Sequence, residues 1–132
     1  MHIVADTNIF LAVALGEPER ARIIEMTTGH ELAAPQVLPF ELGNAIAAMK
    51  KRRILTADEV VPCWDAVQAI PVDLRPIDIR SALHIASRAG IYAYDAYFLE
   101  CALNLRAPLL TLDKQMKRVA RELSIPVMEL PR

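Results

Sequence analysis

The fold of this chain is decided at its N-terminus by the stretch HIVADTN, residues 2–8. A short, mostly apolar run that ends in an acidic and polar triplet is typical of a buried strand followed by a turn into a helix. We therefore predict a first strand over residues 2–5. Asp6 follows this strand directly, so its carboxylate is expected at the strand's carboxyl end.

Similar short apolar runs recur along the chain and alternate with segments of helical periodicity. Further strands are predicted at residues 31–34, 72–74, 108–112 and 125–130, and helices at residues 8–15, 18–27, 56–69, 78–88, 95–105 and 113–123, with one more that ends at residue 53. Alternating strands and helices indicate right-handed βαβ units. The prediction is a three-layer α/β/α fold with a central parallel sheet of four to five short strands.

Composition narrows the classes of protein that fit this pattern. A length of 132 residues predicts a single domain over residues 1–132. The net charge of −1 excludes a strongly basic domain, so any contact with nucleic acid must be local. Cys63 and Cys101 have no CxxC spacing and are predicted to be buried thiols. With no run of about 18 apolar residues, we expect a cytoplasmic protein without a membrane span.

Two aspartates are expected at one edge of the sheet although they lie far apart in sequence. Asp6 follows the first predicted strand, and Asp113 follows the strand predicted at residues 108–112. In open parallel sheets, ligands bind at the carboxyl ends of the strands. Both aspartates would therefore face the position where a ligand is expected.

Two further acids extend this pattern, although each acid also has a purely structural interpretation. Asp6, Asp95 and Asp113 each stand at a predicted helix start, where a carboxylate can cap the helix. Glu41 lies beside the apolar face of its predicted helix, which is costly unless something satisfies the charge. Four converging carboxylates repel one another and favour a cation, and ligation by oxygen alone selects Mg²⁺ or Mn²⁺. Such a site suits hydrolysis of a phosphodiester.

Several motifs now carry a resemblance to a known family. They are VADTN at residues 4–8, Glu41, YDA at residues 94–96 and LTLD at residues 110–113. In this order and spacing the chain resembles the PIN-domain nucleases, and among them the VapC-type toxins of prokaryotic toxin–antitoxin pairs. The resemblance spans essentially the whole chain.

The resemblance implies a role for each matching position. Asp6, Glu41 and Asp95 would bind the metal directly or through water, and Asp113 would complete the acidic cluster. The neighbouring residues that would hydrogen-bond around the site or orient a carboxylate or water are Thr7, Asn8, Asn44 and Thr111. The family further implies single-stranded or structured RNA as the substrate, a homodimer and an antitoxin whose tail covers the active-site groove.

Two other groups of residues have alternative interpretations. The C-terminal basic group, Lys114, Lys117, Arg118 and Arg121, begins one residue after Asp113 and could guide RNA phosphates, or it could be ordinary solvated surface. Tyr92, Tyr94 and Tyr97 surround Asp95 and could stack bases. For these tyrosines we favour core packing with the hydroxyl at the surface, which is the commoner use of tyrosine.

Two alternative functions remain open from the sequence. A dehalogenase-like phosphatase also begins with a strand-end aspartate, but its chemistry requires a second aspartate two residues later, where this chain has Asn8. A catalytically silent PIN fold that binds RNA or protein is the other alternative. The four acids count against it, and stabilisation by a metal would separate it from the nuclease.

Overall fold

A computed structural model describes residues 1–131. Its strands are β1 (His2–Ala5), β2 (Glu31–Pro35), β3 (Asp73–Arg75) and β4 (Leu109–Leu110). Its helices are α1 (Thr7–Ala14), α2 (Arg20–Thr27), α3 (Leu38–Lys51), α4 (Ala57–Gln68), α5 (Ile79–Ala89), α6 (Ala93–Leu105) and α7 (Lys114–Glu122). Within residues 1–131, none of these helices is both long and apolar enough to cross a membrane.

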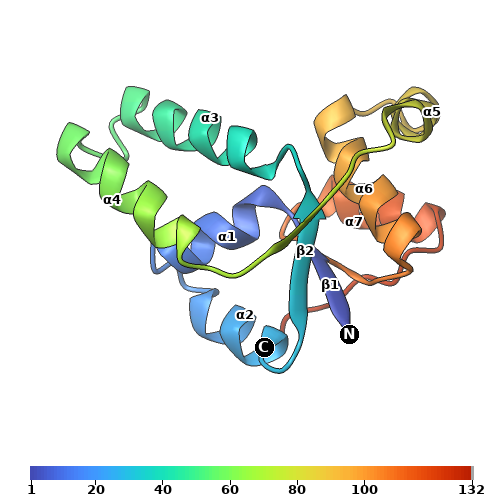
Figure 1. Ribbon diagram of the computed structural model, residues 1–132, viewed down its shortest axis with the longest axis horizontal. Coiled ribbons are helices and arrows are strands. Elements are labelled where there is room, and N and C mark those ends of the chain that lie inside the picture. The colour runs from blue at the N-terminus through green and yellow to red at the C-terminus, as the bar shows by residue number, and fades with distance from the viewer. Residues whose placement is uncertain (132) are drawn as a thin grey trace.

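The four strands form one parallel sheet in the order β3-β2-β1-β4. Two helices connect each strand to the next one in sequence, as parallel pairing requires. Helices α1 to α4 lie on one side of the sheet, and α5, α6 and α7 lie on the other (Figure 1). The predicted three-layer α/β/α fold is confirmed.

The central strand β1 lies in the middle of the hydrophobic core. Ile3, Val4 and Ala5 are fully buried, as are both residues of β4. A strand covered by helices on both faces needs apolar side chains on both, which explains why β1 reads as a continuous apolar run and not as an alternating one. Cys63 and Cys101 are buried and unpaired, as predicted.

Capping residues explain where several helices begin. Asp6 accepts a hydrogen bond from the Ile9 N–H at the start of α1 (3.4 Å). Before α4, the Thr56 N–H donates to Glu59 Oε1 (2.8 Å), and Thr56 and Glu59 together form a capping box. The start of α6 differs from the prediction, because the helix begins at Ala93 and not at Asp95.

The last predicted strand, residues 125–130, is wrong in extent. Only Val127 forms a parallel bridge, with Leu109, and the segment otherwise runs as an extended tail. The backbone pairs there through the Leu109 N–H to Pro126 O (2.8 Å) and the Met128 N–H to Leu109 O (2.9 Å). Pro126 cannot donate a ladder hydrogen bond, and β4 itself offers only two residues for pairing.

Candidate active site

The sheet order brings the two strand-end aspartates together. Strand β4 pairs directly with β1, with Ala5 opposite Leu110. Asp6 and Asp113 follow these strands and cap α1 and α7. Both therefore lie at the carboxyl edge of the sheet, where the sequence predicted them.

A cavity of about 310 Å³ opens at this edge of the sheet. It is lined by all four predicted acids and by three of the four predicted neighbouring residues: Asp6, Glu41, Asp95, Asp113, Thr7, Asn8 and Asn44. The acids come from four separate parts of the chain, at the ends of β1 and β4 and in the first turns of α3 and α6. A single open site thus collects carboxylates separated by more than a hundred positions.

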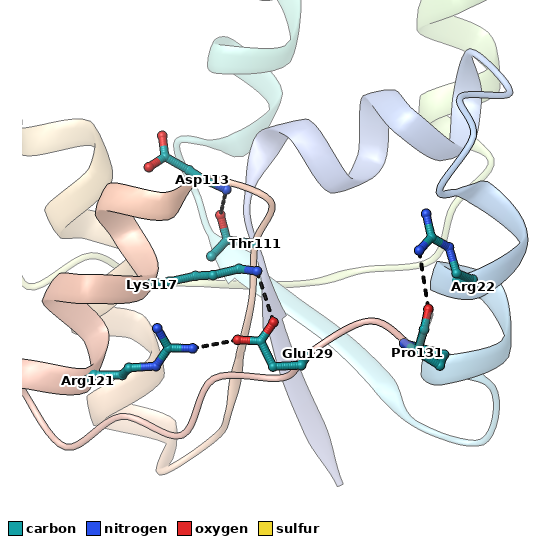
Figure 2. Close-up of polar contacts among 7 residues, drawn as sticks. All are labelled: Arg22, Thr111, Asp113, Lys117, Arg121, Glu129 and Pro131. Atoms are coloured by element: carbon teal, nitrogen blue, oxygen red, sulfur yellow. Dashed lines mark hydrogen bonds and ion pairs between the residues drawn. The ribbon is translucent and has the colours of Figure 1, made fainter.

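Two threonine hydroxyls hold three of the acids in place. The Thr7 hydroxyl donates a hydrogen bond to Glu41 Oε2 (2.6 Å). The buried Thr111 hydroxyl donates to Asp6 Oδ2 and accepts a hydrogen bond from the Asp113 N–H (3.0 Å). Figure 2 shows the second of these Thr111 contacts, at the start of α7. Thr111 lies behind the cavity wall and connects the two strand-end aspartates.

Burial and mutual repulsion raise the pKa values of three acids. Asp6 is 5% exposed, and desolvation raises its pKa from 3.8 to about 6. The hydrogen bond from Thr111 lowers this pKa, whereas the negative charges of Asp113 and Asp95 raise it. Desolvation also raises the pKa of Glu41, and the charge of Asp95 raises it further. The pKa of Asp95 is raised by desolvation and by the charge of Asp113. Ionising the whole group is therefore unfavourable without a cation.

The described part of the chain does not supply that cation. None of the four carboxylates forms a salt bridge with a lysine, arginine or histidine within residues 1–131. A divalent metal ion fits the chemistry, because the polar side chains that line the cavity offer carboxylate, amide and hydroxyl oxygens, with no cysteine or histidine. No three Asp, Glu, His or Cys side chains among the described residues stand ready-made as ligands of one ion. The side chains would have to turn toward a shared ion.

Three of the four side chains of the C-terminal basic group form ion pairs with glutamates. Lys117 Nζ and Arg121 lie 3.1 and 2.5 Å from the two carboxylate oxygens of Glu129, and Arg118 lies 3.4 Å from Glu122 (Figure 2 shows the Glu129 contacts). The extended C-terminal tail brings Glu129 beside α7. Sequence reasoning did not pair these residues, because only the folded tail places Glu129 there.

Two aromatic residues of the site were missed or misjudged. Phe40 and Tyr94 line the same cavity and are 78% and 55% exposed. The expectation of core packing is wrong for Tyr94 and also for Tyr92, which is 84% exposed, because Ala96, Phe98 and Leu99 fill the core side of α6. Phe40 precedes Glu41 and Tyr94 precedes Asp95. That adjacency is the sequence feature that could have identified them.

With the fold and the site in place, the chain can be compared with known proteins. It matches the PIN domain over residues 3–122 and therefore belongs to the PIN-domain family. It is similar to Ribonuclease VapC3 of Pyrobaculum aerophilum, with 26% identity over 122 residues that cover 88% of this chain and 92% of the relative. The predicted resemblance to PIN-domain proteins, and among them to VapC-type proteins, is confirmed.

Two solved structures share the fold. VapBC2 from Rickettsia felis, bound to a DNA fragment from their promoter, matches with a TM-score of 0.70 and 13% identity, covering 99% of this chain and 100% of that chain. PAE2754 from Pyrobaculum aerophilum matches with a TM-score of 0.66 and 19% identity, covering 90% and 87%. These similarities extend along nearly the whole chain.

Proposed function

We propose that this chain is an endoribonuclease that uses Mg²⁺ or Mn²⁺ to hydrolyse RNA phosphodiester bonds. The observation that carries the proposal is the convergence of Asp6, Glu41, Asp95 and Asp113 on one cavity without a cationic partner among the described residues. Carboxylates that form no ion pair with a lysine or arginine of residues 1–131 are poised to bind an external cation. Their position at the carboxyl edge of a parallel sheet is where such folds bind ligands.

Each residue has a distinct role in this proposal. The four acids would hold the metal, which when bound lowers the pKa of a water molecule and offsets the charge of the phosphodiester. Thr7 orients the Glu41 carboxylate, and Thr111 fixes Asp6 while it holds the Asp113 backbone. Asn8 and Asn44, both exposed, present amides into the same cavity and would bind RNA or water.

RNA as the substrate is supported by the relative that is named a ribonuclease. The C-terminal basic group, Lys114, Lys117, Arg118 and Arg121, would contact phosphates beyond the cavity. Glu129 and Glu122 compete for three of these side chains, so we expect their contribution to affinity to be modest. Exposed Lys114, directly after Asp113, is best placed to reach a bound strand.

The biological setting is also part of the proposal. We propose that the protein is the toxin of a type II toxin–antitoxin pair, acts in the cytoplasm, and forms a homodimer bound by a cognate antitoxin. Support comes from its similarity to Ribonuclease VapC3 and to the VapBC2 structure, in which the proteins are bound to DNA of their own promoter.

A second candidate is a PIN fold that binds RNA or protein without catalysis. One observation favours it, namely that the described side chains include no ready-made set of three metal ligands. Binding of a metal at the cavity would separate the two candidates, because only the nuclease requires it.

RNA cleavage tests the proposal. Total cellular RNA is incubated with wild type, Asp6→Asn or Asp65→Asn, in Mg²⁺, Mn²⁺ or a chelator, and the products are mapped by primer extension. Asp65 is exposed on α4 and lies outside the cavity, so it provides a matched control. Loss of metal-assisted charge stabilisation should slow cleavage by Asp6→Asn by at least about 100-fold, and the control should cut like wild type. Identical cuts by wild type and Asp6→Asn would refute the proposal.

A further inference from the structure

Two exposed aromatic rings stand on different helices around the acidic cavity. Phe40 comes from the first turn of α3 and Tyr94 from the first turn of α6, and both line the cavity. Each ring immediately precedes one of the acids, Glu41 or Asp95. Single exposed apolar side chains are ordinary on a protein surface, so the observation that counts is that both rings line the cavity that holds the acids.

Both rings are held on ordered backbone. Tyr94 packs edge-to-face against Tyr97, with ring centroids 5.9 Å apart and planes at 90°. The Phe40 N–H donates to Val37 O (3.0 Å), which fixes the start of α3. Because Tyr97 already orients the Tyr94 ring, Tyr94 loses little conformational freedom when a ligand stacks on it.

The surface between the rings favours a nucleotide chain over a peptide. An apolar helix or strand needs a continuous apolar groove, but much of the lining between Phe40 and Tyr94 is polar, including the Asn8 and Asn44 amides and the four carboxylates. A single-stranded nucleic acid alternates charged phosphates with flat bases, which matches a cavity lined by polar groups and two aromatic rings. Bases in a duplex hide their faces, so the ligand must be unpaired.

We propose that Phe40 and Tyr94 stack the unpaired bases on either side of the phosphodiester bond that the acidic cavity cleaves, so that these two rings supply part of the affinity for a single RNA strand. This inference rests on the proposed nuclease function. It assigns the rings to substrate binding and makes no use of them in the chemical step.

Binding of short RNAs tests the two rings directly. The probes are fluorescein-labelled A12, U12 and an A12·U12 duplex, in Ca²⁺ in place of Mg²⁺ so that binding is measured while cleavage is slowed. The variants are Phe40→Leu and Tyr94→Leu, which remove the aromatic face, and Phe40→Tyr and Tyr94→Phe, which keep it. Tyr92→Leu is the matched control, because Tyr92 is exposed, makes no side-chain cap and lies outside the cavity lining.

Each leucine variant should bind A12 about tenfold more weakly than wild type, and the ring-keeping variants and Tyr92→Leu should stay within about twofold of it. Wild type should prefer A12 to the duplex. Melting curves identify a leucine variant that fails to fold, and Phe40→Met or Tyr94→Met then takes its place.

Parallel cleavage of A12 by wild type in Mg²⁺ separates the two levels of the proposal. If wild type cleaves but the leucine variants bind A12 as wild type does, stacking is wrong and the nuclease stands, which would leave the rings to a protein partner. An equal loss in Tyr92→Leu also overturns stacking. If wild type neither binds nor cleaves single-stranded RNA, the nuclease and the stacking both fail.

Discussion

Acidic side chains lie at both ends of the sheet, but their environments are opposite. At the amino ends of the strands, His2 Nε2 lies 3.1 Å from Glu31 and 3.3 Å from Asp73, whose side chains are 75% and 40% exposed. At the carboxyl ends, Asp6 is buried and, with the other cavity acids, has no basic partner among residues 1–131. Carboxylates are therefore solvated and paired with His2 at the amino ends of the strands. At the carboxyl ends, Asp6 is desolvated and has no such partner among residues 1–131.

This contrast separates structural charge from functional charge. Solvated, paired carboxylates need nothing further and contribute little to stability. The cavity acids carry an electrostatic cost that burial and their neighbours create, as the raised pKa values of Asp6, Glu41 and Asp95 indicate. Perturbed carboxylates gathered in one cavity are typical of functional sites, which supports the proposed metal site.

The largest expected effect is a fall in the stability of the metal-free protein as the pH rises. The folded-state pKa of Asp6, about 6, lies above its ordinary value of 3.8, so the folded state holds a proton that the unfolded chain releases. The resulting destabilisation is absent below about pH 4 and complete above about pH 6, and it is on the order of 3 kcal/mol. Urea unfolding in chelator from pH 5 to 7 measures the upper part of this fall, on the order of 1 kcal/mol.

Asp6→Asn sharpens this measurement because the amide cannot ionise. The variant should lose much of the decline between pH 5 and 7, and Asp65→Asn should keep it. A wild-type free energy of unfolding that stays level or rises over this interval would contradict the assignment of a buried, unpaired Asp6.

A smaller effect is expected at Thr111. Thr111→Val keeps the shape but removes the hydroxyl that bonds Asp6 and the Asp113 backbone, so we expect a loss of about 10- to 100-fold in metal affinity. Calorimetric titration with Mn²⁺ measures this change. Thr28→Val, at an exposed hydroxyl far from the cavity, should leave the affinity unchanged. Equal affinity in Thr111→Val would show that the hydroxyl does not position Asp6.

The smallest effect is expected at the opposite end of the sheet. His2→Ala removes both contacts to Glu31 and Asp73, yet these side chains are solvated, so the free energy of unfolding should change by less than about 1 kcal/mol. Metal binding should not change. A large change in either quantity would remove the distinction between the two ends.

The sequence predicted the carboxyl end of the sheet well because local rules determine it. Asp6 and Asp113 each follow a short apolar run, and parallel topology brings strand ends to one edge, so their meeting required no knowledge of packing. The sequence also placed Thr111 near the site, because Thr111 directly follows β4, the strand that precedes Asp113. The metal-binding roles of these residues stay predictions.

The exposure of the two aromatic rings and the position of the C-terminal tail depend on tertiary packing, which local sequence patterns do not determine. The exposure of Phe40 and Tyr94 follows from which face of α3 and α6 meets the core. From the sequence, we favoured core packing for Tyr94 and made no prediction for Phe40. Glu129 reaches Lys117 only because the tail pairs with β4 and not with another strand. The predicted last strand failed for the same reason, since β4 is too short to pair with all of it.

Thermal unfolding with and without divalent metal tests the central claim most directly. Wild type and Glu31→Gln, altered at the amino end of the sheet, should gain at least about 5 °C in Tm in Mg²⁺ or Mn²⁺ at roughly 100 times its Kd. Asp6→Asn, altered at the carboxyl end, should lose most of this gain. A wild type insensitive to both ions, or an Asp6→Asn variant that gains as much as wild type, would contradict a metal site at the four carboxylates.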